Sequence, residues 1–341
     1  MNYIGTRNKD ICATASKAIL QGICEDGGLF LPEEMPVMKK PLSELVQLDY
    51  RALAYEILSL FLTDFTEEEL KACINGAYDE KFDVPEIVPV VKAGDVSILE
   101  LFHGKTIAFK DMALSILPYL MKTAAKKNGL DKEIVILTAT SGDTGKAALE
   151  GFAGVEGVKI IVFFPEDGVS PVQKLQMVTQ EGDNTCVVGI KGNFDDAQTA
   201  VKTIFTDAAL QQELEEKGFV FSSANSINIG RLVPQVVYYF WGYLQMAKQG
   251  EITLGDEINV TVPTGNFGNI LAGYFAKQMG VPVKTFLCAS NDNKVLYDFF
   301  TTGTYDKNRP FMVTTSPSMD ILISSNLERL LCLLTNQETC K

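Results

Sequence analysis

Runs of apolar residues alternate with segments of helical periodicity along most of the chain after residue 85. Five of these runs have the length and character of buried strands. They span residues 134–140, 160–165, 184–190, 257–263 and 283–288. Continuous apolar strands separated by helices are typical of parallel βαβ units whose sheets are covered on both faces. The pattern therefore predicts an α/β fold with two parallel sheets.

The first 84 residues show a different pattern. Helical periodicity runs through residues 50–62, and Thr66 followed by Glu69 resembles the capping box that opens another helix. A turn at Gly27 and Gly28 and a short extended stretch interrupt the helical segments. This part is predicted to form a mostly helical N-terminal lobe.

These changes of pattern divide the chain into three parts. We expect the helical lobe at residues 1–84 and a smaller α/β domain at residues 111–235. A larger α/β domain is expected from two separate stretches, residues 85–110 and 236–341. The length of 341 residues agrees with about two domains that each bury a sizeable core.

Charge and composition argue against several classes of function. The net charge of −13 argues against nucleic acid or an anionic membrane as the main partner. The N-terminus lacks the apolar core of a signal peptide, and no run approaches ~18 uninterrupted apolar residues, so no membrane span is expected. The seven cysteines are scattered, which favours free thiols in a reducing cytoplasm over disulfides or a zinc site. His103 is the only histidine, so triad and multi-histidine metal chemistry is not expected, and we assign no metal ligands.

Lys110 is the first candidate for chemistry. It lies between Phe109 and the apolar residues of a helix predicted over residues 111–128. Packing of this segment would remove water from the amine, and desolvation lowers the pKa of an amine because it disfavours the charged form. A neutral amine attacks carbonyl groups, so Lys110 is a candidate Schiff-base lysine. The alternative is an ordinary surface lysine on an amphipathic helix.

Two glycine-rich loops each follow a predicted strand and precede a predicted helix. Their residues are Ser141, Gly142, Asp143 and Thr144 in the first loop and Gly265, Asn266, Phe267, Gly268 and Asn269 in the second. Backbone N–H groups and the dipole at the start of a helix favour a bound carboxylate or phosphate. Neither loop has the spacing of a Walker A or G-x-G-x-x-G motif. Nucleotide binding at the first loop is therefore the least favoured of the functions considered. Simple tight turns are the alternative.

A third polar cluster lies between the strand-like residues 219–221 and the following helix. Arg231 can bind an anion through two donors, and Asn225 or Asn228 can add neutral donors. The alternative is that the asparagines cap the helix and Arg231 lies on its surface. Together with Lys110, the three clusters form a coherent set for an anionic small molecule.

Six blocks of the sequence, in their order along the chain, resemble those of threonine synthase, a fold-type II pyridoxal 5′-phosphate (PLP) enzyme. The blocks lie at residues 26–29, 102–111, 140–145, 225–231, 263–268 and 316–321. Glycine loops recur across fold-type II enzymes. The Phe109-Lys110-Asp111 context and the Ser-Pro-Ser-Met-Asp-Ile block at 316–321 are similar to threonine synthase in particular. The resemblance implies a tryptophan synthase β-like fold with PLP bound between two parallel-sheet domains.

The resemblance also implies an activity, the conversion of O-phospho-L-homoserine and water into L-threonine and phosphate by β,γ-elimination and hydration. Lys110 would hold PLP and move protons on the substrate, and the loop from Gly265 to Asn269 would bind the cofactor phosphate. The loop from Ser141 to Thr144 would bind the substrate carboxylate, with Asp143 near the cofactor ring hydroxyl. Arg231 and Asn225 would bind the substrate phosphate. The expected partner is thus a small molecule, and the chain is expected to be a monomer or homodimer.

The sequence departs from the family pattern in two places. Lys105 stands where the family more often has proline, which adds positive charge near the site or alters the turn. Related sequences also continue well beyond residue 341 and carry there the hydroxyl expected at the cofactor's pyridine nitrogen. The larger domain is therefore expected to be incomplete at its C-terminal side. Two other functions stay open, a threonine dehydratase-like lyase and a non-catalytic threonine synthase-like protein that binds PLP or a phosphorylated amino acid.

Overall fold

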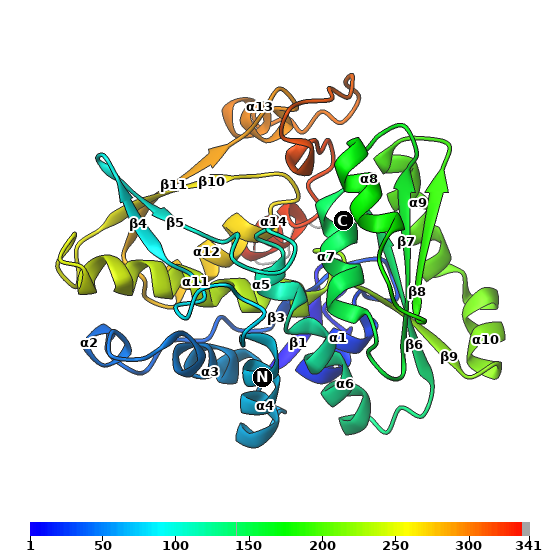
Figure 1. The fold of residues 1–341 in the computed structure, drawn as a ribbon, viewed down its shortest axis with the longest axis horizontal. Helices are drawn as coiled ribbons and strands as arrows, with labels where there is room; N and C mark the ends of the chain where they lie inside the picture. Colours follow the sequence, from blue (N-terminus) through cyan, green and yellow to red (C-terminus); the bar gives the residue numbers. More distant parts are fainter. Residues whose placement is uncertain (141, 336–341) are drawn as a thin grey trace.

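The computed structural model describes residues 1–140 and 142–335 (Figure 1). Its largest sheet has four parallel strands in the order β8-β7-β6-β9, on the right of Figure 1. The strands are β6 (Glu133–Ala139), β7 (Val158–Pro165), β8 (Thr185–Ile190) and β9 (Phe219–Ser223). The helices between them are α7 (Asp143–Phe152), α8 (Pro171–Val178), α9 (Phe194–Thr206) and α10 (Ala208–Glu216). This alternation confirms the predicted α/β fold with parallel strands.

Strand β6 shows why the sequence pattern was informative. It pairs with β7 on one side and β9 on the other, and its residues from Ile134 to Ala139 are all buried. A strand covered on both faces needs apolar side chains at successive positions. Since all four strands are parallel, the polar residues that follow them gather at one edge of the sheet.

The second parallel pair is β10 (Ile258–Pro263) with β11 (Val283–Ala289), and α12 (Gly268–Gln278) connects the two strands. Two further strands precede Lys110 and form a separate antiparallel hairpin, β4 (Val90–Ala93) and β5 (Val96–Leu99). The chain then continues through α13 (Val295–Thr302), the 3₁₀ turn η1 (Pro317–Met319) and α14 (Leu327–Leu334).

The N-terminal part contains a sheet that the sequence pattern did not predict. Strands β1 (Asn2–Gly5), β2 (Cys12–Thr14) and β3 (Phe30–Pro32) form an antiparallel sheet in the order β2-β1-β3. Strands of three or four residues are too short to show a clear period. The helices of this part are α1 (Ala15–Gln21), α2 (Leu42–Leu45), α3 (Tyr50–Phe61) and α4 (Glu67–Ala77). The predicted capping box is present, since Thr66 and Glu69 exchange hydrogen bonds at the start of α4.

Helix α11 (Ile229–Lys248) runs through the middle of the molecule. Nearly all of its residues from Ile229 to Leu244 are buried, and it packs against α3, α12 and the short α5 (Asp111–Leu114). The boundary predicted at residues 235–236 falls inside this helix. One hydrophobic cluster also joins Phe61, Leu149 and Phe275, one from each predicted part of the chain. The proposed domain limits remain predictions.

The single helix expected over residues 111–128 is divided in two. The first piece is α5, and the second is α6 (Leu117–Lys127). Pro118 stands at the start of α6 and has no N–H to donate to the carbonyl of Leu114. The helix is therefore interrupted just after α5, and the prediction of one continuous helix was wrong in this detail.

Three general features bear on function. The structure has no disulfide among the cysteines that it describes. None of the helices within residues 1–140 and 142–335 combines the length and apolar character needed to cross a bilayer. Over the same residues, no group of His, Cys, Asp and Glu side chains is arranged to hold a metal ion.

Candidate active site

Lys110 lies at the wall of a pocket between the two parallel sheets. Its side chain is 11% exposed, and its Nζ lies 2.5 Å from Oδ1 of Asp143, the first residue of α7. Asp143 follows the carboxyl end of β6, as the predicted strand-to-helix turn requires. At this position Asp143 meets the segment that leads into α5. Two elements that are remote in sequence therefore supply one buried ion pair.

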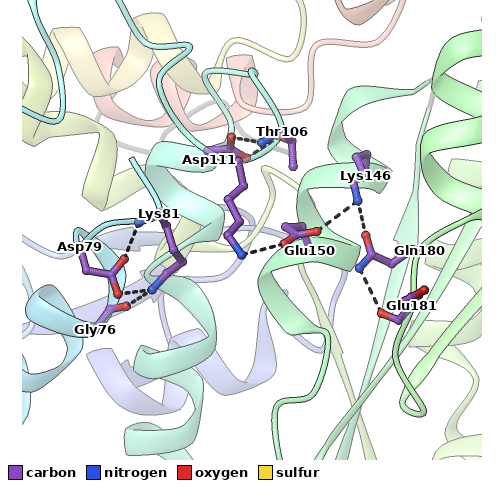
Figure 2. A network of polar contacts seen from close by, with 10 residues as sticks. Gly76, Asp79, Lys81, Thr106, Asp111, Lys146, Glu150, Gln180 and Glu181 are labelled. Carbon is purple, nitrogen blue, oxygen red and sulfur yellow. Dashed lines mark hydrogen bonds and ion pairs between the residues drawn. The ribbon is translucent and has the colours of Figure 1, made fainter. Parts of the chain in front are cut away.

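The turn before Lys110 is held by the next residue, Asp111. Its carboxylate accepts hydrogen bonds from the backbone N–H of Thr106 at 2.8 Å and from the Thr106 hydroxyl at 2.6 Å, a contact visible in Figure 2. Gly104 makes this close approach possible, because a Cβ at that position would lie 2.5 Å from Oδ2 of Asp111. The backbone of the turn is thus fixed on both sides of Lys110.

Burial and charge act in opposite directions on this pair. Burial lowers the pKa of Lys110, and the neighbouring carboxylate of Asp143 only partly offsets that effect. Burial alone would raise the pKa of Asp143, but Lys110 and a hydrogen bond from Ser318 hold the pKa below its ordinary value. The amine is therefore easier to deprotonate than an ordinary lysine, as its apolar surroundings predicted.

The second glycine loop faces the same pocket. Phe267 adopts a left-handed conformation with φ of 64°, and α12 begins directly after it at Gly268. Gly265 packs against the backbone of η1, since a Cβ there would lie 3.3 Å from Cα of Met319. In the described chain no group accepts a hydrogen bond from the backbone N–H groups of residues 266–269. Unpaired N–H groups at a helix start are suited to bind a phosphate.

Arg231 places a cation in the same pocket. The side chain is 2% exposed, its Nη1 donates to the carbonyl oxygen of Ala224 at 2.6 Å, and its Nε has no partner among the described residues. Burial lowers the pKa of Arg231 to about 10, so the side chain stays charged at neutral pH. It also lies in the first turn of α11, where the helix dipole is unfavourable for a cation. A bound anion would relieve both costs.

The two asparagines of this cluster differ. Asn225 lines the pocket, and its side-chain amide exchanges hydrogen bonds with the backbone of Ala139 at the end of β6. Asn228 is fully buried; its amide nitrogen donates to the carbonyl oxygens of Ile19 and Ser223, and its oxygen caps α11. These contacts support a capping role for Asn228 and give no support to the expected substrate contact.

The first glycine loop is only partly open to a ligand. Ser141 lies outside the described residues. The hydroxyl of Thr140 accepts hydrogen bonds at 2.9 Å from the backbone N–H groups of both Gly142 and Gly145, so these donors are already used. Thr144 does line the pocket. Of this loop, Thr144 is therefore the best-placed residue for a direct contact with a small molecule.

Several pocket residues had not been assigned a role from the sequence. They are Phe109, Ser226, Gln235, Pro263, Thr264, Ser318 and Met319. Most of them adjoin a predicted motif, and Ser318 and Met319 belong to the block at residues 316–321. Gln235 stands one helical turn after Arg231, a spacing that places both side chains on one face of α11.

The additional lysines near the site are held by other partners. Nζ of Lys105 lies 3.4 Å from Glu150 of α7. Figure 2 shows Lys146 between Glu150 and Gln180, and it lies 3.1 Å from Glu150. Lys174 lies 3.5 Å from Glu166. Among the described lysines, only Lys110 lines the pocket.

Comparisons with known proteins show the family of the chain. A family model described as "Threonine synthase N terminus" matches residues 2–78, and one described as "Pyridoxal-phosphate dependent enzyme" matches residues 91–334. Threonine synthase from Pseudomonas aeruginosa is 39% identical over 97% of this chain and 68% of its own length. The chain belongs to the threonine synthase family of pyridoxal-phosphate dependent enzymes. The resemblance of the six sequence blocks is confirmed.

The solved structures of the family share the fold. PLP-bound threonine synthase from Brucella melitensis superposes with a TM-score of 0.87 at 38% identity, over 99% of this chain and 70% of the other chain. The yeast enzyme gives the same TM-score at 36% identity, over 99% of this chain and 67% of the other. Human threonine synthase-like 1 is 44% identical over 95% of this chain but only 45% of its own length. The chain thus spans less than half of that relative.

Proposed function

We propose that this chain binds PLP between Lys110 and the loop of residues 265–269. The observation that carries this proposal is that a desolvated lysine and a row of unpaired N–H donors line one pocket. The loop offers the donors that a phosphate needs, and the amine offers the nucleophile that an aldehyde needs. The same loop holds a further polar atom, the buried side-chain oxygen of Asn266. This oxygen has no hydrogen-bond partner among the described residues.

We further propose that the substrate is O-phospho-L-homoserine, as in threonine synthase. Arg231 supplies a buried cation for the phosphate group, and Thr144 supplies a donor for the carboxylate. Asn225 ties the end of β6 to this cluster and so keeps the two anion-binding groups at a fixed distance. Two separated anion sites hold the substrate in one orientation with its reacting carbons near Lys110.

The proposed reaction removes phosphate from the γ carbon and adds water so that the hydroxyl ends on the β carbon. When bound, PLP supplies an electron sink for negative charge at the carbons beside the substrate amine. Lys110 would take the protons that leave the α and β carbons and return one to the α carbon and one to the γ carbon that loses phosphate, because its lowered pKa gives access to the neutral form. Asp143 would keep the amine in place and remain ionised.

The first experiment is an absorption spectrum of the purified chain with added PLP, followed by borohydride reduction and peptide mapping. We expect a visible band that free PLP lacks and a pyridoxyl label on Lys110. Lys110→Ala should abolish both, whereas Lys146→Ala should leave both intact because Lys146 does not line the pocket. A label on another lysine would contradict the assignment. Release of phosphate from O-phospho-L-homoserine then tests the reaction itself.

The comparisons are also consistent with a second candidate, a threonine synthase-like protein that binds PLP without turnover. Threonine synthase-like 1 proteins match this chain at 42–44% identity, and the chain covers 44–45% of their length. Labelling of Lys110 without phosphate release would support this candidate. Activity on free threonine or serine would instead support a dehydratase. The proposed cytoplasmic location rests on the scattered cysteines and is tested by cell fractionation. The proposed monomer or homodimer rests on the family resemblance and is tested by sedimentation.

A further inference from the structure

A short segment before α14 is hydrogen-bonded to the second glycine loop. The Ser324 hydroxyl donates to the carbonyl oxygen of Gly265 at 2.5 Å. The backbone N–H and the side-chain amide of Asn326 both donate to the carbonyl oxygen of Asn266, each at 3.1 Å. Ser324 is 6% exposed and Asn326 is fully buried, so these contacts are shielded from water. Two successive carbonyl groups of the loop are therefore held on the same side.

The direction of these carbonyls determines the direction of two N–H groups. In a planar trans peptide the C=O and N–H bonds point in opposite directions. The carbonyl of Gly265 shares its peptide with the N–H of Asn266, and the carbonyl of Asn266 shares its peptide with the N–H of Phe267. Both N–H groups must then point away from the segment that holds the carbonyls. These are two of the loop's unpaired donors, and their residues line the pocket that contains Lys110.

Arg329 fixes the orientation of the Asn326 amide. Its guanidinium donates to the side-chain oxygen of Asn326, to the carbonyl oxygen of Phe30 at 2.8 Å and to that of Ile227 at 2.6 Å. An amide whose oxygen faces Arg329 must direct its nitrogen the other way, towards Asn266. Because Arg329 has no exposed surface, this arrangement is not interrupted by solvent.

We propose that Ser324 and Asn326 are positioning residues that aim the N–H groups of Asn266 and Phe267 at the phosphate of the cofactor. Arg329 sets the orientation of the Asn326 side-chain amide. The inference rests on the proposed binding of PLP at residues 265–269. It predicts a selective effect, because these side chains act on the phosphate end of the cofactor and not on the aldehyde end at Lys110.

The test compares two ligands by spectroscopic titration of the whole chain, PLP and 5′-deoxypyridoxal, which lacks the phosphate. In Ser324→Ala the Kd for PLP should rise about threefold to tenfold, as expected for one lost hydrogen bond. The Kd for 5′-deoxypyridoxal should stay within about twofold of the unsubstituted protein. Asn326→Asp keeps an acceptor for Arg329 and removes the side-chain donor to Asn266, although the backbone donor remains, and should show the same selectivity. Ser324→Thr retains a hydroxyl and should restore tight PLP binding.

Ser325→Ala is the matched control. Ser325 stands between Ser324 and Asn326 in the same segment, and its buried hydroxyl has no hydrogen-bond partner among the described residues. Its removal should therefore change neither Kd. Equal weakening of both ligands in Ser324→Ala and Asn326→Asp would overturn the positioning role and indicate general loosening of the fold. If the unsubstituted protein did not prefer PLP over 5′-deoxypyridoxal, the proposed binding of the cofactor phosphate by residues 265–269 would itself be refuted. The two failures are therefore distinguishable.

Discussion

Nζ of Lys110 lies 2.5 Å from Oδ1 of Asp143, and neither side chain is more than 17% exposed. This pair connects the turn before α5 with the start of α7. Since burial lowers the pKa of Lys110 while Asp143 raises it, the carboxylate limits the fraction of amine that is neutral. The pair therefore holds the amine in place and opposes the deprotonation that burial favours.

Replacement of Asp143 should therefore change the protonation of Lys110. In Asp143→Asn the carboxylate is lost, and burial and the positive charge of Arg231 then lower the pKa of Lys110 without opposition, so this pKa should fall further. The pH dependence of reductive methylation at Lys110, measured by mass spectrometry, reports this shift. Glu150→Gln is the control, because Glu150 lies in the same helix and pairs with Lys105 and Lys146. An unchanged or higher Lys110 pKa in Asp143→Asn would contradict the prediction.

Arg231 should determine recognition of the phosphate group. Charge-assisted hydrogen bonds contribute about 1.5–3 kcal/mol, so Arg231→Lys, which cannot bind two oxygens in the same plane, should weaken O-phospho-L-homoserine binding about tenfold to a hundredfold. Binding of L-homoserine, which lacks the phosphate, should change much less. Spectral titration of the PLP-loaded chain measures both ligands.

The control for Arg231 is Arg309→Lys. Arg309 is bonded to Asp298 and does not line the pocket, so both affinities should be retained. An equal loss of both ligands in Arg231→Lys would mean that Arg231 supports the fold around Ala224 and does not select the phosphate.

Local pattern predicted much of this site because several functional residues follow strands or begin helices. The buried strand β6 produced a continuous apolar run, and the residues after it necessarily lie at the sheet edge. The loop at Gly265 was recognisable because Gly265 and Gly268 stand between an apolar strand and a helical segment. The desolvation of Lys110 followed from its apolar neighbours, which are close in sequence.

Contacts between remote segments could not be predicted in this way. Thr140 uses the N–H groups of Gly142 and Gly145, and no property of the loop sequence indicates that these donors are already paired. The interactions of Asn228 with Ile19 depend on how α1 packs against α11. Ser318 reaches Asp143 from a part of the chain 175 residues away by numbering, a proximity that only the tertiary fold creates.

Gly104 should be sensitive to the smallest substitution. Its Cβ in Gly104→Ala would meet Oδ2 and Cβ of Asp111 at 2.5 and 2.6 Å, and the Asp111 carboxylate cannot move without losing its bonds to Thr106. Overpacking of this kind costs about 1–3 kcal/mol in the free energy of unfolding. Urea unfolding of the two proteins measures the difference.

Gly242→Ala provides the comparison for Gly104→Ala. Gly242 lies inside α11, and the nearest atom to its Cβ would be a methyl group of Leu99 at 3.3 Å, on a half-buried side chain that can shift. Alanine is favoured over glycine by about 1 kcal/mol within a helix, so this variant should be at least as stable as the original chain. Equal destabilisation by the two substitutions would show that the turn before Lys110 is not unusually tight.

His103 should make the stability of the Lys110 turn depend on pH. Its Nδ1 lies 2.6 Å from Asp83 and its Nε2 lies 3.0 Å from Glu100. Burial alone would lower the pKa of His103, but the hydrogen bonds to Glu100 and Asp83 raise it above its ordinary value. A histidine whose pKa is raised by folding stabilises the folded state below its unfolded pKa of about 6.5. This contribution is lost as the pH rises through the folded-state pKa.

The measurement is the free energy of unfolding in urea for the original chain and for His103→Gln. The pH series should run from below the unfolded pKa of about 6.5 to above the folded-state pKa. Glutamine keeps a hydrogen-bonding side chain but does not titrate, so the stability difference between the two proteins should shrink as the pH rises. Added salt should also reduce the difference at low pH, because Asp83 is largely exposed and its attraction to the imidazolium is screened. A difference that stayed constant over the whole range would contradict the prediction, because it would show that folding does not change the pKa of His103.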